Sequence, residues 1–417
     1  MGRGQSGGGK SKSSYSQIKE QYNANKLNTE GLKEILLYAI ENVPFYSGIT
    51  EPELSLFPVM TKQAYKREKE NCISREFQNT LDSLYTASTS GSTGTPFKVF
   101  WDAGKRLRHK AEMIYFNTLI GWELGDHYVF IRNWVSNYSQ SKLKSIAQNV
   151  TNISIASFDD NKKAWLCNHL KSKKNSILFG YSSSVCDFMN YIKKQNIDGS
   201  SLKLKLVVCD SDELTAKNKT ELEDTFKCTV INRYDNEENG LLATSLPGEN
   251  KFTVNFPSIY MELLKPDSDE PAEKGEIGRI VVTDLFNHAM PLIRYDVGDY
   301  AISDDEPGDI KTLRVLSGRK ADSLYAIDGK LISSVAISGI TEIFTEIEKY
   351  QIVQKSKTDF DFNYIGKLSK NNNELLSQRL HDSLGATANI DLIEVNNLEA
   401  RENGKFKTTV NMLTYIR

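Results

Sequence analysis

Apolar residues recur along the chain with two periods, and the period changes with position. Between residues 30 and 42 they return every three or four positions, which predicts one amphipathic helix that Pro44 ends. From about residue 127, short β-rich runs alternate with amphipathic helical stretches. The runs cover 127–132, 152–157, 176–180, 203–208 and 228–233, and the helical stretches include 162–173, 183–194 and 213–226. Such alternation predicts a parallel sheet with right-handed crossovers.

After Gly240 the pattern changes to β-runs separated by Gly, Pro and Asp turns. From about residue 318 it indicates a small α+β unit, with helices at 334–348 and 372–384. Its strands are expected at 350–356, 360–366, 389–395 and 406–414. The predicted fold class is α/β, with a large N-terminal domain that has parallel βαβ units and a β-rich subdomain, and a small mobile C-terminal domain. We expect a flexible tail at 1–16 and domains at 17–317 and 318–417.

Composition narrows the class of protein. The 417 residues include 52 Lys and Arg against 54 Asp and Glu, a formal net charge of −2, which argues against nucleic-acid binding through a broad basic face. Apolar runs stay well short of the roughly 20 residues that span a bilayer. Five scattered cysteines without a CxxC pair favour a reduced, cytoplasmic protein in which they act as small core residues.

Two glycine-rich segments could bind phosphate. The first contains GxxxxGK[ST] at Gly4–Ser11, but no strand can precede it, so we interpret it as a terminal tail. The second, 86–98, lies between strand-like residues and combines glycines with hydroxyls, which suits a phosphate clamp and equally an ordinary loop. Further polar segments follow in order at 232–240, 291–299, 317–322 and 403–405.

Together these segments resemble the adenylate-forming (acyl-CoA synthetase) superfamily, in particular its phenylacetate–CoA ligase and capsule-biosynthesis branch. The loop Thr89–Pro96 carries most of the likeness, and 43–46 and 57–62 resemble two landmarks of the branch. The resemblance covers about residues 30–417. It implies an AMP-forming ligase that converts a carboxylic acid to an acyl-adenylate with ATP and Mg²⁺, releases pyrophosphate, and transfers the acyl group to CoA.

The resemblance also implies roles for individual residues. The ATP-binding residues would be Ser90, Gly91, Ser92, Thr93, Gly94, Thr95, Tyr234, Asp299 and Arg319. Glu238 would hold Mg²⁺, Asp299 would accept both ribose hydroxyls, and Lys405 would bridge the substrate carboxylate and the α-phosphate. The acyl pocket would draw on Arg132, Trp134, Tyr181 and Ser182, unless these are scaffold residues at strand ends.

Departures from the family pattern keep other functions open. Glu237 replaces a hydroxyl beside Glu238, which raises the question of which carboxylate holds the metal, and Ala321 occupies the hinge position. The adenine-side loop, 209–213, is more acidic than usual. One alternative passes the acyl group to an amine or hydroxyl, as in surface-polysaccharide synthesis, and another is a non-catalytic nucleotide-binding relative. The partner would be a small carboxylic acid, and the branch also includes dimers, so a homodimer is compatible with the resemblance.

Overall fold

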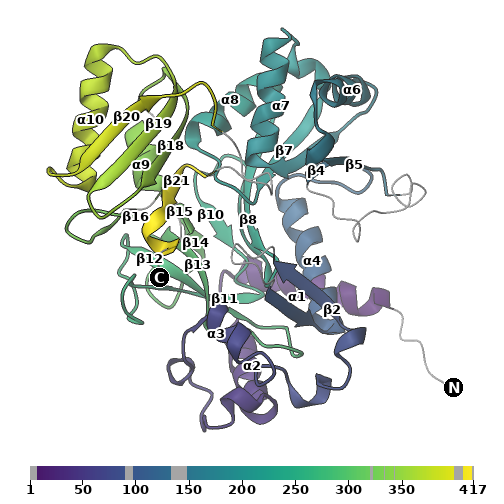
Figure 1. Cartoon of the computed structure of the whole chain (residues 1–417). Coiled ribbons are helices and arrows are strands. Elements are labelled where there is room, and N and C mark those ends of the chain that lie inside the picture. The colour runs from purple at the N-terminus through teal and green to yellow at the C-terminus, as the bar shows by residue number, and fades with distance from the viewer. Residues whose placement is uncertain are drawn as a thin grey trace. The chain divides into compact units, whose positions relative to one another are not determined.

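A computed structural model describes residues 7–89, 97–132, 148–319, 323–332, 334–341, 343–398 and 407–415. It confirms the predicted mixed α/β class (Figure 1). Contacts within the chain define two compact units, one of residues 1–124 and 231–315 and the other of residues 125–230 and 316–417. Each unit is described by itself. The division into functional domains at residue 317 stays a prediction.

The first unit begins with a helix where a tail was expected. Helix α1 spans Gly7–Ala24 and packs on α4, Ala103–Leu119. Ile18 is fully buried, and the ring centroids of Tyr15 and Tyr22 lie 5.6 and 5.5 Å from that of Tyr115. The flexible tail predicted for 1–16 is therefore wrong from residue 7 onward, because Tyr15, Ile18 and Tyr22 form a helical stripe that the low-complexity residues before them obscured.

Two groups of strands and a hairpin build the rest of this unit. β8 (Thr229–Asn236), β9 (Gly240–Ser245), β10 (Phe252–Val254) and β14 (Thr312–Leu313) pair antiparallel in the order β14-β10-β9-β8. The second group runs β1-β13-β12-β11, with bounds Met60–Thr61, Tyr295–Ile302, Ile277–Asp284 and Ile259–Leu264. The hairpin joins β2 (Tyr85–Thr89) to β3 (Phe97–Trp101). Helix α2, Thr29–Asn42, confirms the predicted N-terminal helix, and α3 spans Lys62–Arg67.

The second unit contains the predicted parallel strands. They run in the order β7-β6-β4-β5, with bounds Leu204–Asp210, Ser176–Tyr181, His127–Arg132 and Val150–Ser154. Helix α6 (Asp160–Lys171) connects β5 to β6, α7 (Ser182–Lys194) lies between β6 and β7, and α8 (Ala216–Phe226) follows β7. Val129 and Val207 of the strands share a buried core with Leu166, Phe188 and Phe226 of the helices. This core explains the near-continuous apolar runs of β6 and β7, since strands covered by helices bury successive side chains.

The last hundred residues form a second sheet. Strands β18 (Ile347–Gln354), β19 (Asp359–Gly366), β20 (Asn389–Glu394) and β21 (Thr409–Asn411) pair in the order β20-β19-β18-β21. Leu376, Leu380 and Leu384 of α10 (Lys370–Leu384) are buried against this sheet. Smaller elements precede it: β15 (Val315–Arg319), β16 (Leu324–Tyr325), β17 (Leu331–Ile332) and α9 (Ser334–Thr341). The helix predicted at 334–348 is wrong at its end, because alternating burial from Ile347 onward belongs to β18.

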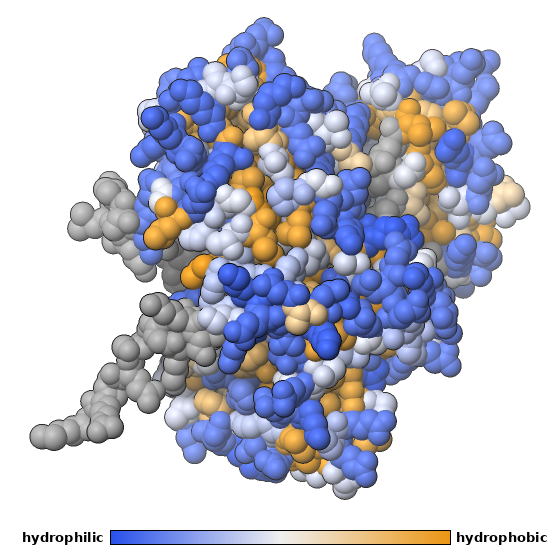
Figure 2. Space-filling model, turned by 180° about the vertical axis from the view of Figure 1, so that it is seen from behind, coloured by the Kyte–Doolittle hydropathy of each residue, from blue (hydrophilic) through white to orange (hydrophobic). Residues whose placement is uncertain are grey.

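The cysteines and the surface agree with a globular chain. All five cysteines are free, and burial raises the pKa of Cys72, Cys186 and Cys228 to about 12, so they are unreactive packing residues. Figure 2 shows one face, on which hydrophilic residues predominate and hydrophobic areas are small. In the described part of the chain, every helix is too short or too polar to cross a membrane.

Candidate functional site

Glu238 is a buried carboxylate in the turn between β8 and β9. Its Oε1 accepts hydrogen bonds from Lys62 Nζ at 3.1 Å and from Tyr295 Oη at 3.0 Å. The Glu238 side chain is 6% exposed, whereas that of Lys62 is 32% exposed. The neighbouring Glu237 is exposed. The two adjacent glutamates therefore differ in burial, and Glu238 is the buried one.

Lys62 lies between this carboxylate and the β2–β3 hairpin. Its Nζ lies 5.8 Å from the ring centroid of Phe97, the first residue after the loop. Thr89 and Phe97 are paired across the β2–β3 hairpin, so the two ends of the loop lie side by side. Ser90, Gly91, Ser92, Thr93, Gly94 and Thr95 themselves lie outside the described residues. Lys62 belongs to the segment 57–62, which resembles the branch, but no role was predicted for it.

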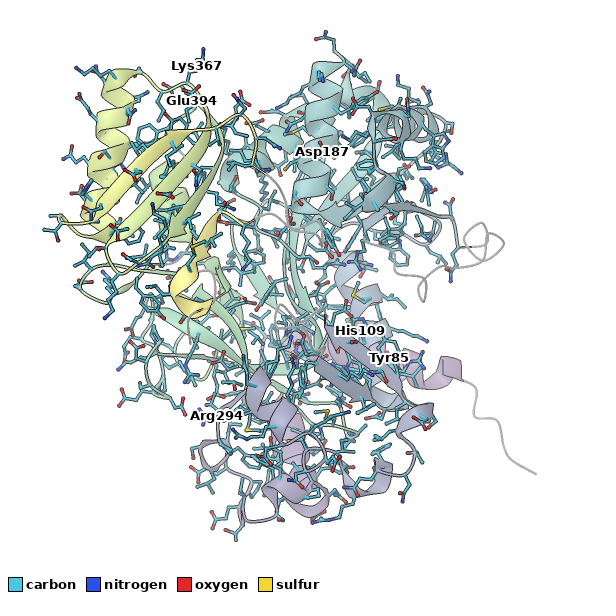
Figure 3. The ribbon with its side chains drawn as sticks, in the orientation of Figure 1. Tyr85, His109, Asp187, Arg294, Lys367 and Glu394 are labelled. Atoms are coloured by element: carbon cyan, nitrogen blue, oxygen red, sulfur yellow. The ribbon has the colours of Figure 1, made fainter. Side chains whose placement is uncertain are left out.

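The Glu238 turn packs against Trp101, at the end of β3, and against His109 on α4. Trp101 Nε1 donates a buried hydrogen bond to the Glu238 carbonyl oxygen at 2.9 Å. The Trp101 ring centroid lies 5.2 Å from that of His109, which is labelled in Figure 3. Gly240 has a φ of +85°, and a Cβ there would lie 2.7 Å from His109 Nδ1. The turn therefore depends on both a left-handed backbone and a missing side chain at this position.

Buried charges anchor α4 beneath this turn. Lys105 Nζ lies 2.7 Å from Asp284 Oδ2, with both side chains fully buried, and 5.3 Å from the Trp101 ring centroid. Burial alone would raise the pKa of Glu112, but Lys105, His109 and Arg108 outweigh it and lower that pKa to about 2. Burial would likewise lower the pKa of Lys105, but Asp284 and Glu112 raise it. The charges compensate one another, which is the condition for burying them.

Tyr234 and Asp299, both predicted nucleotide ligands, are in contact. Tyr234 on β8 donates its hydroxyl to Asp299 Oδ2 on β13 at 2.7 Å. Both side chains are partly exposed. The arrangement orients one oxygen of the carboxylate, so a vicinal diol at Asp299 would share the site with the Tyr234 hydroxyl.

A second polar cluster lies at the carboxyl ends of the parallel strands in the other unit. Arg132 ends β4, Tyr181 ends β6 and Asp210 ends β7, and Tyr181 and Asp210 are register partners. Arg132 Nη2 forms an ion pair with Asp210 Oδ2. Ser182 is buried, and its hydroxyl donates to the Asp212 carbonyl oxygen at 2.9 Å. The structure thus gathers three of the four residues predicted for the acyl pocket at one sheet edge.

No side-chain contacts are described for three other predicted site residues. Trp134 and Lys405 lie outside the described residues, and Arg319 is the last residue of β15. Their roles remain predictions. Trp101 had no predicted role, and Asp210 was predicted only as part of the adenine-side loop, 209–213. The position of Asp210 at the end of a parallel strand was the available signal.

The residues around Glu238 fit Mg²⁺ only together with a nucleotide. Among the described residues, no group of three or more His, Cys, Asp or Glu side chains could hold a metal ion. Mg²⁺ in proteins usually keeps several waters and takes one or two carboxylates plus substrate phosphates. Glu238 beside the hairpin that carries the loop provides one such carboxylate, on the condition that the ion competes with Lys62.

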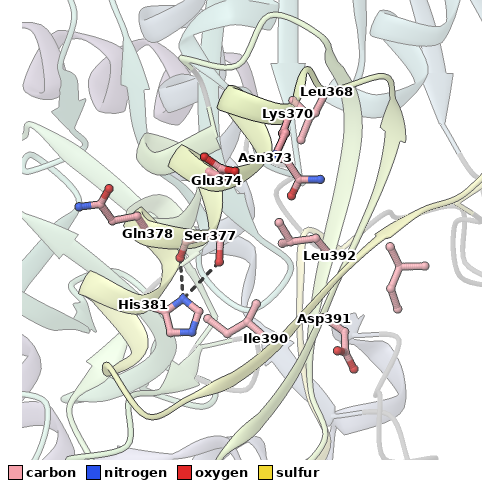
Figure 4. A pocket seen from close by; sticks show the side chains of 11 residues that line it. Leu368, Lys370, Asn373, Glu374, Ser377, Gln378, His381, Ile390, Asp391 and Leu392 are labelled. Atoms are coloured by element: carbon pink, nitrogen blue, oxygen red, sulfur yellow. Dashed lines mark hydrogen bonds between the residues drawn. The ribbon is translucent and has the colours of Figure 1, made fainter.

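An open groove lies between α10 and β20 (Figure 4). It contains none of the predicted site residues. Its histidine, His381, points both ring nitrogens at carbonyl oxygens, with Nδ1 2.7 Å from Ser377 O and Nε2 3.1 Å from Ala388 O. These contacts connect α10 to the turn before β20, which is a packing role.

Comparison with known proteins shows what this chain is similar to. Residues 324–412 match the family model described as the CapK C-terminal domain. Protein CapK of Staphylococcus aureus is 22% identical over 426 residues, covering 95% of this chain and 92% of its own. Phenylacetate-coenzyme A ligase of Escherichia coli K12 is 24% identical over 336 residues, covering 72% and 71%. A solved structure of 2-hydroxyisobutyryl-CoA ligase in the postadenylation state has a TM-score of 0.71 at 16% identity, covering 93% and 91%.

The fold is therefore that of the adenylate-forming ligases. The chain is a relative of CapK and of the phenylacetate–coenzyme A ligases, which confirms the resemblance seen in its motifs.

Proposed function

We propose that this protein activates a carboxylic acid as an acyl-adenylate at the expense of ATP and then transfers the acyl group to CoA as a thioester. One observation carries the proposal: Glu238 is buried, held by Lys62 and Tyr295, and lies beside the hairpin whose loop matches the family's phosphate loop. The contact between Tyr234 and Asp299 adds a prepared acceptor for ribose hydroxyls.

In the first step, a carboxylate oxygen of the substrate attacks the α-phosphorus of ATP. The bond from that phosphorus to the bridging oxygen breaks, and pyrophosphate leaves. Ser90–Thr95 would hold the β- and γ-phosphates, Glu238 would hold Mg²⁺, and Asp299 with Arg319 would hold the ribose. Bound Mg²⁺ would neutralise charge on the phosphates. Lys405 would lie between the two reacting anions and reduce their repulsion.

In the second step, the CoA thiolate attacks the acyl carbonyl carbon, and AMP leaves with the electrons of the broken C–O bond. The C-terminal domain would rotate near 320–322 between the two steps, so that Lys405 serves only the first. A domain that presents two faces in turn would thus separate the two half-reactions.

A second acceptor class is supported by one observation. Protein CapK, a relative that matches over 95% of this chain, is not named as a CoA ligase. The alternative is that the adenylate passes to an amine or hydroxyl, with the same first step.

ATP–pyrophosphate exchange with a panel of carboxylic acids tests the shared first step. We expect acid-dependent exchange that Glu238→Gln lowers by about 100-fold, because the variant removes a metal-binding charge. Glu237→Gln is the matched control: it makes the same change at the adjacent exposed residue and should retain exchange. Absence of exchange with every acid would overturn the proposal in favour of a non-catalytic nucleotide-binding protein. Mass analysis of products formed with CoA, amines and hydroxyl compounds then distinguishes the two acceptor classes.

A further inference from the structure

The ion pair between Arg132 and Asp210, at the end of the parallel strands, packs against two aromatic rings. The guanidinium carbon of Arg132 lies 4.7 Å from the Phe179 ring centroid and 5.9 Å from that of Phe130. The two rings lie 5.2 Å apart. Phe130 and Arg132 alternate with Val129 and Ile131, which belong to the helix-covered core. Arg132 and these rings therefore line the face of the strands opposite that core.

Asp210 neutralises Arg132 and still has one oxygen without a hydrogen bond. Its side chain is completely buried, and Oδ2 pairs with Arg132. Its other oxygen, Oδ1, has no hydrogen-bond partner in the described part of the chain. A buried acceptor without a donor costs free energy, so a ligand that brings a donor to this oxygen gains affinity.

Asp210 belongs to the loop, 209–213, that the resemblance assigns to the adenine side, but its ion pair is with Arg132, which was predicted for the acyl pocket. The strand order is β7-β6-β4, so the carboxylate of Asp210 reaches across β6 toward Arg132 on β4. Tyr181, also predicted for the acyl pocket, ends the strand between them. The nucleotide residue Tyr234 belongs to a different strand, β8.

We propose that Arg132 and Asp210 select a carboxylic acid that carries, in addition to the reacting carboxylate, a hydrogen-bond donor such as a hydroxyl or amino group. The donor binds Asp210 Oδ1, and the apolar part of the acid packs on Phe130 and Phe179. A second carboxylate is disfavoured because Arg132 is already neutralised and Asp210 repels it. This inference rests on the proposed adenylation.

The inference is tested by measuring ATP–pyrophosphate exchange with sets of acids that differ in one substituent. Each set contains an unsubstituted acid, its hydroxyl and amino derivatives, and its carboxylate derivative, for example phenylacetate and its 4-substituted forms. We expect the best set to show kcat/KM at least about tenfold higher for a donor-bearing member than for the unsubstituted acid, because the donor satisfies a buried acceptor.

Two variants should shift the preference toward acids whose substituents carry opposite charges. Asp210→Asn removes the repelling charge and leaves Arg132 unpaired, so the carboxylate-bearing member should gain at least about fivefold relative to the hydroxyl member. Arg132→Gln leaves a buried negative charge, so the amino member should gain relative to the hydroxyl member. Asp224→Asn, at an exposed ion pair of α8, is the control and should leave the order unchanged. Thermal unfolding of each variant checks that it is folded.

The outcomes separate this inference from the proposed function. Exchange with equal or higher kcat/KM for unsubstituted acids in every set, or an unchanged order in both variants, would overturn the inference and leave adenylation standing. A uniform rise of KM for ATP in Asp210→Asn, with the order of acids preserved, would assign Asp210 to the adenine instead. No exchange with any acid would overturn the proposed function and, with it, this inference.

Discussion

At the scale of single residues, burial decides what a charged side chain can do. Glu237 and Glu238 are adjacent and chemically identical, yet only Glu238 is buried and bonded to Lys62 and Tyr295. Burial first, and then the neighbouring Glu238, raise the pKa of Tyr295 well above its ordinary value, so its hydroxyl remains a donor. The residue environment thereby favours one of two carboxylates that the sequence could not distinguish.

Lys62 should compete with a metal ion for Glu238. We expect Lys62→Met to bind Mg²⁺ about tenfold more tightly than the unaltered protein when ATP is bound, because a positive charge 3.1 Å from the carboxylate is removed. The dependence of ATP–pyrophosphate exchange on Mg²⁺ concentration at fixed ATP measures this change. Lys33→Met, at an exposed position of α2, controls for the loss of one surface charge. Equal Mg²⁺ affinity in Lys62→Met and the unaltered protein would refute the competition.

At the scale of elements, the β2–β3 hairpin and α4 act as a support for the Glu238 turn. Trp101 ends the hairpin strand and donates to the Glu238 carbonyl, while His109 on α4 occupies the space beside Gly240. Trp101 and His109 are not among the residues predicted to bind a ligand. Their packing instead determines where the buried carboxylate lies.

Gly240→Ala should destabilise this support. We expect a loss of about 2 kcal/mol in the free energy of unfolding, because φ is +85° and the added Cβ would meet His109. Urea denaturation measures the loss. His109→Ala in the same chain should restore the part due to the steric contact but not the part due to the backbone. If the double variant is no more stable than Gly240→Ala, the contact with His109 is not the cause.

A pH-sensitive histidine lies at the opposite end of the parallel strands. His127 bonds Ser176 Oγ at 2.8 Å and Thr151 Oγ1 at 3.0 Å, and Thr151 Oγ1 also lies 3.1 Å from His169 Nε2. Burial, and then the charges of His169 and Lys173, lower the pKa of His127 to about 4. The unfolded chain therefore binds a proton at higher pH than the folded one.

At the scale of the whole molecule, stability should consequently fall as the pH falls from about 6.5 to 4. His127 contributes roughly 1–3 kcal/mol to this loss, the free energy of keeping a buried imidazole neutral. Denaturation at a series of pH values should show a smaller slope over this interval for His127→Gln. His288→Gln, at a partly exposed histidine, should keep the slope of the unaltered protein. An identical slope in His127→Gln would show that other groups cause the acid loss.

The proposed division of labour between domains is also a property of the whole molecule. Lys405→Ala should abolish ATP–pyrophosphate exchange while largely sparing the reaction of a supplied acyl-adenylate with its acceptor, since the lysine serves the first step alone. Separate assays of the two half-reactions measure this. Equal loss of both would refute the assignment of Lys405.

The sequence by itself indicated the α/β class, the parallel strands and the resemblance to adenylate-forming ligases. Periodicity and ordered motifs are local properties, and they remain legible without contacts. The helix 334–348 was wrong at its end, and the tail 1–16 was wrong from residue 7 onward, where local composition conflicted with the packing of Ile347 and Ile18. Only the tertiary structure decided which glutamate is buried, that Lys62 pairs with it, and that Asp210 neutralises Arg132. These contacts join residues 176 and 78 positions apart, and no local pattern encodes a partner at that separation.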